Sequence, residues 1–187
     1  MLNLPNLLTL LRIALIPVFV VVFYAPMKWA HLASAAIFGL AAVTDWVDGY
    51  LARRWSQTSA FGAFLDPVAD KLMVAVALVL LVQVNPTPIL AIPAAIIIGR
   101  EIAVSALREW MAEIGERAQV AVSALGKFKT TAQMAALLLL LYRDPIGDLP
   151  TMTVGYVLLY TAAALTFWSM VVYLQAAWPT LRGGKGG

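Results

Sequence analysis

The stretch DWVDGYLARRWSQTSAFGAFLDPVADK, residues 45–71, decides the fold because it places four aspartates between two strongly apolar segments. Asp45 and Asp48 lie at the end of one segment, and Asp66 and Asp70 lie at the start of the next. If these segments cross a membrane, each aspartate at the bilayer centre costs about 2.5–3.5 kcal/mol, and four without partners cost on the order of 10 kcal/mol. The protein must therefore offset this charge.

The composition of the whole chain favours a membrane protein. Of its 187 residues, 62% are hydrophobic and 12% are charged, and the mean hydropathy is +0.86, whereas a soluble domain is about 45–50% apolar. A net charge of +3 does not indicate a nucleic-acid partner, because the basic residues lie at the ends of apolar runs. The chain has no cysteine, so any metal must be held by oxygen ligands.

Apolar runs of about 20 residues, the length that crosses a hydrocarbon core of about 30 Å, predict an all-α integral membrane protein. We expect a bundle of about six transmembrane helices, drawn at residues 7–24, 29–51, 64–84, 89–107, 122–142 and 152–176. The first run lacks the basic lead and cleavage site of a signal peptide, so we expect it to be retained. With no repeat or linker visible, we expect one domain, residues 1–181, and a flexible tail, residues 182–187.

The basic residues predict the orientation of this bundle. An even number of spans places both termini on one side of the membrane, and the side richer in lysine and arginine faces the cytoplasm. One predicted side holds only Lys28 and Arg143, whereas the other holds Arg53, Arg54, Arg108, Arg117, Lys127, Lys129, Arg182 and Lys185. We therefore expect a multi-pass protein of the inner (cytoplasmic) membrane, with both termini and the aspartates on the cytoplasmic side.

The spacing of the aspartates predicts two acidic helix faces. Asp45 and Asp48 are three residues apart and Asp66 and Asp70 are four apart, so each pair shares a face. Two such faces opposed across a short turn would form a hollow lined by oxygens. Hard divalent cations such as Mg²⁺ or Mn²⁺ prefer these ligands and complete their shells with water or phosphate.

Small residues accompany both acidic faces. Gly49 and Ala52 continue the first face, and Gly62 precedes Asp66 by one turn. Their short side chains would let a bulky phosphorylated ligand approach the backbone. Arg53 adds a planar donor for phosphate oxygens.

Simpler explanations exist for each residue. Asp66 before Pro67 is a good helix N-cap, Asp45 and Asp48 could form a polar turn at the membrane edge, and Arg53 could only set the topology. The regular spacing on two consecutive segments favours metal and phosphate binding over these separate causes.

The full pattern is Asp45-x2-Asp48-Gly49-x2-Ala52-Arg53-x8-Gly62-x3-Asp66-x3-Asp70, and it resembles the signature of the CDP-alcohol phosphotransferase family with every fixed position filled. Such a pattern is far more specific than a short motif. The segments NLPNLLTLLRIALIP, GREIAVSALREWMAE and ALGKFKTTAQM, which begin at residues 3, 99 and 124, are similar to the phosphatidylglycerophosphate synthase branch of that family.

The resemblance implies a six-helix membrane enzyme with the fold of this family, usually a homodimer. It implies transfer of the phosphatidyl group of CDP-diacylglycerol to sn-glycerol 3-phosphate by in-line displacement, with CMP released and phosphatidylglycerol phosphate formed. Two ions of Mg²⁺ or Mn²⁺ are expected. By the same resemblance Asp45, Asp48, Asp66 and Asp70 bind metal, and Asp70 is also the catalytic base.

The resemblance places the nucleotide and diphosphate beside the small residues of the signature and its arginine, namely Gly49, Ala52, Arg53 and Gly62. The acceptor is a second anion and needs cations of its own. Candidates near the predicted cytoplasmic boundary are Arg100, Arg108, Lys127 and Lys129, with Arg12, Lys71, Gln119 and Gln133 as weaker ones. Alternatively, Arg100 could pair with Glu101, and the two lysines could anchor a helix end.

Two other functions remain open at this point. The same family includes enzymes with another acceptor, such as inositol phosphate, serine or phosphatidylglycerol, and the aspartates do not distinguish among these. A small ion transporter could use membrane carboxylates as a relay, but no inverted repeat is visible. A prenyl-diphosphate synthase also uses paired aspartates, but the composition argues against that soluble class.

Overall fold

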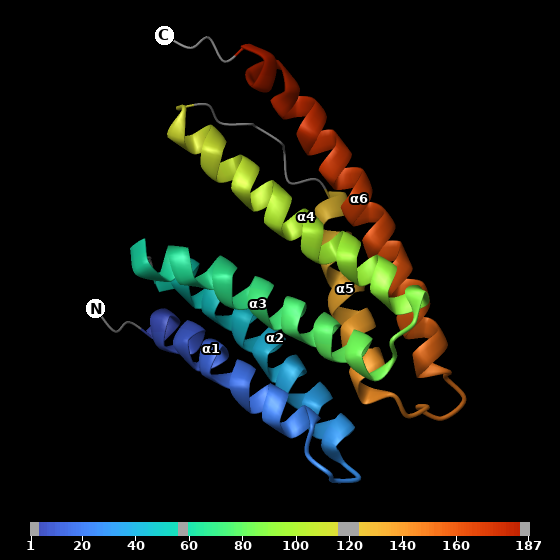
Figure 1. Cartoon of the computed structure of the whole chain (residues 1–187). Coiled ribbons are helices and arrows are strands. Elements are labelled where there is room, and N and C mark those ends of the chain that lie inside the picture. The colour runs from blue at the N-terminus through green and yellow to red at the C-terminus, as the bar shows by residue number, and fades with distance from the viewer. Residues whose placement is uncertain (1–3, 56–59, 116–123, 184–187) are drawn as a thin grey trace.

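Within residues 4–55, 60–115 and 124–183, which the computed structural model describes, the chain forms six α-helices (Figure 1). They are α1 (Leu4–Phe23), α2 (Ala30–Trp55), α3 (Ala60–Val84), α4 (Pro88–Glu113), α5 (Ala124–Tyr142) and α6 (Thr151–Gly183). The predicted all-α fold with six helices is confirmed. The last helix continues past the expected end of its span and includes the first two residues of the expected tail.

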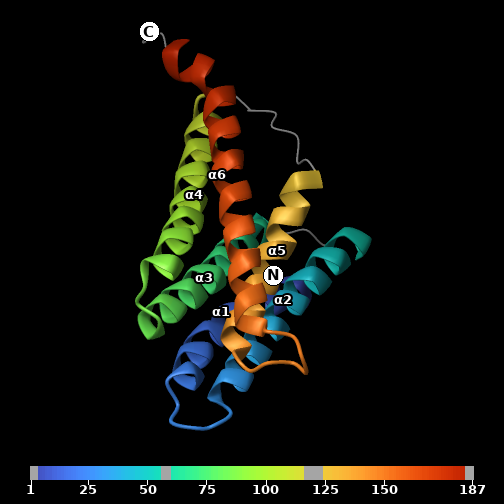
Figure 2. The ribbon, with the colours of Figure 1, turned by 90° about the vertical axis from the view of Figure 1, so that its right-hand side faces the viewer.

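The helices alternate in direction along the bundle. The connections 24–29, 85–87 and 143–150 lie together at one end, which we call the loop end (Figure 1). Helix α1 begins and α6 ends at the opposite end, which we call the terminal end. Helix α1 packs along both α2 and α3, α5 packs against α2 and α6, and α4 packs against α6 (Figures 1 and 2). The predicted location of both chain ends on one side agrees with this arrangement.

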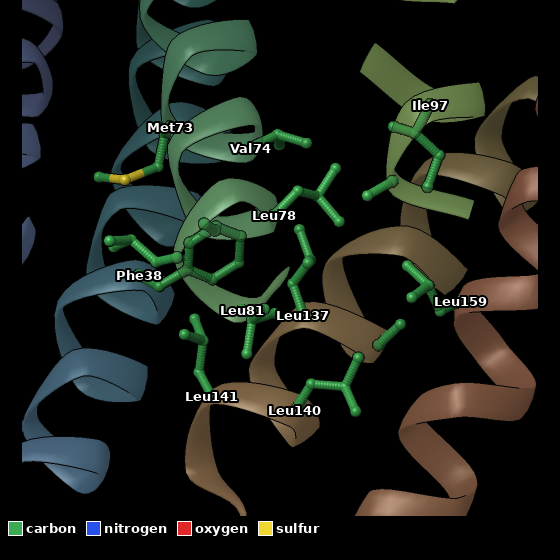
Figure 3. Close-up of a cluster of buried hydrophobic side chains, with 14 of the residues drawn as sticks. Phe38, Met73, Val74, Leu78, Leu81, Ile97, Leu137, Leu140, Leu141 and Leu159 are labelled. Carbon is green, nitrogen blue, oxygen red and sulfur yellow. The ribbon is translucent and has the colours of Figure 1, made fainter. Parts of the chain in front are cut away.

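Leucines of α5 form the centre of the packed core (Figure 3). Leu137, Leu140 and Leu141 are almost fully buried and lie among Phe38 of α2 and Leu78 of α3 in one cluster. The cluster also takes in residues of α4 and α6. This core contains residues of α2, α3, α4, α5 and α6, and Phe19 contributes a side chain from α1.

The outer surface is apolar, as a membrane requires. Val21, Phe64, Ile102 and Trp168 each expose more than 60% of their surface, which would be unfavourable in water. Within the described residues, three helical segments are long and apolar enough to cross a membrane: Phe64–Val84, Pro88–Glu113 and Thr151–Trp178. Three shorter apolar helices accompany them, at Leu7–Phe23, Ala30–Asp45 and Phe128–Tyr142. The chain is therefore a helical membrane protein.

Polar contacts join the helices at the loop end, and we call this set the loop-end clasp. His31 Nε2 lies 2.6 Å from Asp144 Oδ2, and the Arg143 guanidinium lies 5.4 Å from the centre of the Phe23 ring. The remaining members are the hydrogen bonds from Tyr24 to Gln83 and from Asn85 to Tyr156, each 3.0 Å long. The Tyr24 bond links the connection after α1 to α3, and the Asn85 bond links the connection after α3 to α6. Phe23 of α1 and His31 of α2 both contact the connection after α5.

The proposed N-cap role of Asp66 is wrong. Helix α3 begins at Ala60, so Asp66 and Pro67 lie inside the helix, about two turns from its start. Proline removes one hydrogen bond from the helix, yet Pro17 and Pro93 also lie inside helices of this chain. Neighbouring groups compensate for such losses in membrane helices, so proline does not mark a boundary here.

Candidate active site

Helix α1 contacts the aspartates of both following helices. Arg12 Nη1 donates a hydrogen bond of 2.5 Å to Asp45 Oδ1 on α2 and forms an ion pair with it. One turn earlier on α1, Thr9 Oγ1 donates a hydrogen bond to Asp66 Oδ1 on α3. Because Thr9 and Arg12 are three residues apart, they share one face of α1. That face therefore brings Asp45 and Asp66 to the same side of the bundle.

Asp70 lies within the same charged cluster. Asp45, Arg12, Glu101 and Lys71 are close enough to Asp70 to interact with its charge. Asp66 is one turn before Asp70 on α3 and shares its face. Asp45 of α2 and Asp66 of α3 thus both contact α1, and Asp70 follows Asp66 on the same face of α3.

Side-chain exposure differs strongly between members of the cluster. Arg12 exposes 1% of its side chain, whereas Asp45, its partner, exposes 43%. Asp66 and Asp70 are also partly exposed. Intramembrane arginines face the protein interior and pair there with acidic groups, and Arg12 does so here. The carboxylates are left facing outward, where a ligand can reach them.

The donor set fits a hard divalent cation. The described members are all carboxylates, and carboxylate oxygen is the ligand type that Mg²⁺ and Mn²⁺ prefer. Asp48 lies on α2, but its side chain is outside the described part of the structure. Among the side chains that are described, no three acidic or histidine groups already form a metal-binding arrangement. Assignment of the four aspartates as ligands therefore stays a prediction.

The predicted nucleotide-binding residues are only partly described. Gly62 is buried on α3, one turn before Asp66. Gly49, Ala52 and Arg53 belong to the last part of α2, and their side-chain environment lies outside the described residues.

A second cluster, on α4, α5 and α6, contains two of the predicted acceptor-binding residues. Arg100 Nη1 lies 2.9 Å from Glu101 Oε1, and Arg100 Nη2 donates a 3.0 Å hydrogen bond to Ser169 Oγ. Lys129 Nζ approaches the same Glu101 oxygen at 3.5 Å. The expected alternative, a pair between Arg100 and Glu101, is thus present, but the cluster has two cations for one carboxylate.

One donor of this second cluster is unused. Arg100 Nε is buried and has no hydrogen-bond partner within the described residues. A buried N–H without a partner costs about 1–3 kcal/mol, so a ligand that accepts from it would gain that energy. Glu101 lines a cavity together with Lys71, the residue that follows Asp70 on α3.

A largely apolar cavity of about 800 Å³ lies between α3 and α4. Its polar lining consists of Lys71, Glu101, Ser105, Arg108 and Glu109. Lys71 donates a hydrogen bond to Ser105 across it. Helices α3 and α4 diverge from the connection 85–87 toward the terminal end (Figures 1 and 2).

The predicted acceptor-binding residues therefore lie in different surroundings. Arg100 and Lys129 meet at Glu101, whereas Arg108 is exposed and lines the cavity between α3 and α4. Lys127 and Gln119 lie outside the described side chains, and Gln133 is buried on α5.

Sequence reasoning missed two contacts. Thr9 and Ser169 are single hydroxyl residues in apolar runs, and such residues usually bond to a carbonyl of their own helix. Nothing in the sequence next to Thr9 or Ser169 indicated that either residue would bond to another helix. Arg12 did carry a signal, because it is one charge in an otherwise apolar helix, but its partner was not predictable without the packing of α1 on α2.

Comparisons with known proteins agree with this geometry. Residues 2–168 match the family model described as CDP-alcohol phosphatidyltransferase. A relative from Sodalis glossinidius is 61% identical over 176 residues, which cover 94% of this chain and 95% of the relative. A relative from Pectobacterium atrosepticum is also 61% identical, over 94% of each chain. One from Yersinia enterocolitica is 58% identical over 96% of this chain and 97% of its own length. All three are named CDP-diacylglycerol–glycerol-3-phosphate 3-phosphatidyltransferase.

Proposed function

Because this chain belongs to the CDP-alcohol phosphatidyltransferase family, we infer that it transfers the phosphatidyl group of CDP-diacylglycerol to sn-glycerol 3-phosphate. The products are phosphatidylglycerol phosphate and CMP. The observation that carries this conclusion is the identity of about 60% over nearly the whole chain to relatives named for that reaction.

The reaction joins two anions at one phosphorus atom. The acceptor hydroxyl oxygen forms a bond to the phosphorus that carries diacylglycerol, and the bond from that phosphorus to the oxygen bridging to CMP breaks. CMP leaves with the bridging oxygen, and the hydroxyl proton must pass to a base. Asp70 is our candidate for that base, since it lies beside Asp45 and on the same face as Asp66.

Asp45, Asp48, Asp66 and Asp70 would hold Mg²⁺ or Mn²⁺, with two ions expected. Bound there, the ions would neutralise the charge of the diphosphate and of the departing CMP. The all-oxygen donor set and the outward-facing carboxylates support this assignment. Gly49, Ala52, Arg53 and Gly62 would border the nucleotide, because they follow the faces of the same aspartates.

Arg100 and Lys129 would bind the phosphate of the acceptor. They supply two positive charges against the single carboxylate of Glu101, and the buried Arg100 Nε has an unused donor. A phosphate dianion would accept from these groups in charge-assisted hydrogen bonds. Arg108 and Lys127 are further candidates, but no described contact joins them to this cluster.

The cavity between α3 and α4 suits a lipid substrate. Its wall is mainly apolar, and its polar residues include Lys71 and Glu101, both of which act on Asp70. An acyl chain could lie along the wall while its phosphate reaches the aspartates. We propose that the site lies near the terminal end, and we assign this end to the cytoplasmic face of the inner membrane from the distribution of basic residues. A homodimer is implied by the resemblance to the family.

CMP release from purified protein tests the reaction. With CDP-diacylglycerol present, glycerol 3-phosphate should give CMP, whereas inositol phosphate, serine and phosphatidylglycerol should give little. Asp70→Asn should lower kcat by about 10²–10⁴-fold while CDP-diacylglycerol still binds, because the proton acceptor is lost.

Asp148→Asn, at an exposed position of the loop end, is the matched control and should leave turnover unchanged. The assignment of the acceptor is wrong if another acceptor, and not glycerol 3-phosphate, releases CMP. The assignment of Asp70 is wrong if its asparagine variant turns over normally.

A further inference from the structure

Two buried side chains of α1 contact the aspartates without facing the ligand side of the cluster. Thr9 and Arg12 are each 1% exposed, and they bond to Asp66 and Asp45 respectively. We propose that Thr9 and Arg12 are positioning residues, which hold these two carboxylates in the orientation that receives the divalent ion. This proposal rests on the function inferred above.

Each contact engages one oxygen of its carboxylate. Thr9 bonds to Oδ1 of Asp66, and Arg12 bonds to Oδ1 of Asp45. A carboxylate has two oxygens, so a hydrogen bond to one restricts rotation of the group and leaves the other, Oδ2, for a ligand. Groups that orient metal ligands in this way commonly change metal affinity when they are removed.

Arg12 is far more buried than Asp45. We infer from this that the arginine orients the carboxylate that binds the ion and does not compete with the ion for it. The guanidinium lies on the core side of Asp45, while the carboxylate is 43% exposed. An ion that arrives from the exposed side would meet Asp45 first and need not displace the arginine. Through this ion pair Arg12 also offsets the negative charge of Asp45 before any ion is bound.

A single helix makes both contacts, and this sets the distance between the two acidic faces. Thr9 and Arg12 lie about one turn apart on α1, and α1 packs along both α2 and α3. Asp45 on α2 and Asp66 on α3 are therefore fixed relative to each other by the rigid spacing of α1. Loss of either contact would leave one carboxylate free to rotate.

Thr9→Val tests the proposal, because valine has nearly the shape of threonine but no hydroxyl. Mn²⁺ binding to the purified protein, followed by electron paramagnetic resonance without substrate, should show a Kd about 10–100-fold higher than for the wild type. Thr9→Ser should restore binding to within a few-fold. In the enzyme assay, the Mn²⁺ concentration at half-maximal rate should rise by a similar factor, while kcat at saturating Mn²⁺ stays within a few-fold.

Thr166→Val is the matched control. Thr166 is fully buried on α6, and its hydroxyl has no hydrogen-bond partner within the described residues. The same substitution there should leave the Kd for Mn²⁺ within about twofold of the wild type. Equal Kd values for Thr9→Val and Thr166→Val would overturn the positioning role of Thr9.

Arg12→Lys and Arg12→Met test the arginine. Both should weaken Mn²⁺ binding, and lysine should do so less because it keeps the charge. Tighter binding by either variant would mean that Arg12 competes with the ion, which would overturn its positioning role. If the wild-type chain itself bound no Mn²⁺, the proposed metal-dependent function would be wrong. This outcome differs from failure of the positioning role, in which the wild type binds Mn²⁺ but the variants do not bind it more weakly.

Discussion

Arg100 has the most specific surroundings of the predicted acceptor-binding residues. Its guanidinium bonds to Glu101 and Ser169 through two of its nitrogens, and its third nitrogen, Nε, is buried without a partner within the described residues. The guanidinium is thus held in a fixed orientation with one donor left over. The unused donor supports our proposal that Arg100 binds a phosphate.

Arg100→Gln should therefore weaken binding of glycerol 3-phosphate. A hydrogen bond to a charged group contributes about 1.5–3 kcal/mol, so the KM for the acceptor should rise tenfold or more, while the KM for CDP-diacylglycerol changes little. Steady-state rates of CMP release at varied concentrations of each substrate measure both values.

Arg143→Gln is the matched control, because Arg143 lies at the loop end beside Phe23. That variant should leave both KM values near those of the wild type. An unchanged KM for glycerol 3-phosphate in Arg100→Gln would show that the acceptor phosphate binds elsewhere, with Arg108 and Lys127 as the next candidates.

The residues of the candidate site differ in how far the sequence could predict them. The aspartates were predictable because their spacing on a helix is regular and their charge is unusual in an apolar segment. Thr9 was not, because its role depends on α1 packing against α3, 57 residues further along the chain. A contact of that separation leaves no periodic trace in one sequence.

At the scale of elements, α5 and α6 approach each other closely at a glycine. A Cβ atom added to Gly155 of α6 would lie 2.9 Å from Cγ of Leu140 and 3.4 Å from Cβ of Leu139 on α5. Leu140 is itself 1% exposed and belongs to the core. Small residues at such interfaces let two membrane helices pack closely, so Gly155 sets the distance between α5 and α6.

Gly155→Ala should destabilise the protein. Overpacking a core costs about 1–3 kcal/mol, which exceeds the gain of about 1 kcal/mol from replacing glycine by alanine in a helix. The apparent Tm in detergent should fall by a few degrees.

Gly99→Ala is the control, since a Cβ at Gly99 meets no atom within 4 Å. That variant should keep or slightly raise the Tm, because only the helix propensity changes. A fall of the same size in both variants would contradict the account given for Gly155.

The elements themselves were largely predictable, because each apolar run had the length of a membrane helix. The start of α3 was the exception. Proline usually marks a helix boundary, so Asp66 and Pro67 suggested a start, whereas the helix begins at Ala60. The reason lies in the surroundings: inside a membrane bundle, neighbouring groups can compensate for the hydrogen bond that proline removes.

At the scale of the whole molecule, both ends of the described chain lie at one end of the bundle (Figure 1). The aspartates lie in the later part of α2 and the earlier part of α3. The distribution of lysine and arginine predicts that the terminal end faces the cytoplasm. The chain has no cysteine, so a single introduced cysteine reports its own location without background. Glu113 and Asp148 are both exposed, at the end of α4 and at the loop end respectively.

Cysteine labelling in intact spheroplasts should therefore distinguish the two faces. A maleimide that does not cross membranes should label Asp148→Cys in intact spheroplasts and Glu113→Cys only after permeabilisation. Labelling after permeabilisation is the control for reactivity of each cysteine. The reverse pattern would place the aspartates on the outer face and contradict the predicted orientation.

The loop-end clasp has a consequence for how a lipid reaches the aspartates. Hydrogen bonds and a cation–π contact join the helices to one another at the loop end, whereas α3 and α4 diverge toward the terminal end (Figures 1 and 2). We propose that a lipid already dissolved in the neighbouring leaflet enters sideways through the cavity between α3 and α4 and leaves the same way. The lipid substrate and the lipid product then exchange with the bilayer without unfolding of the helix bundle. Their acyl chains do not have to pass through water.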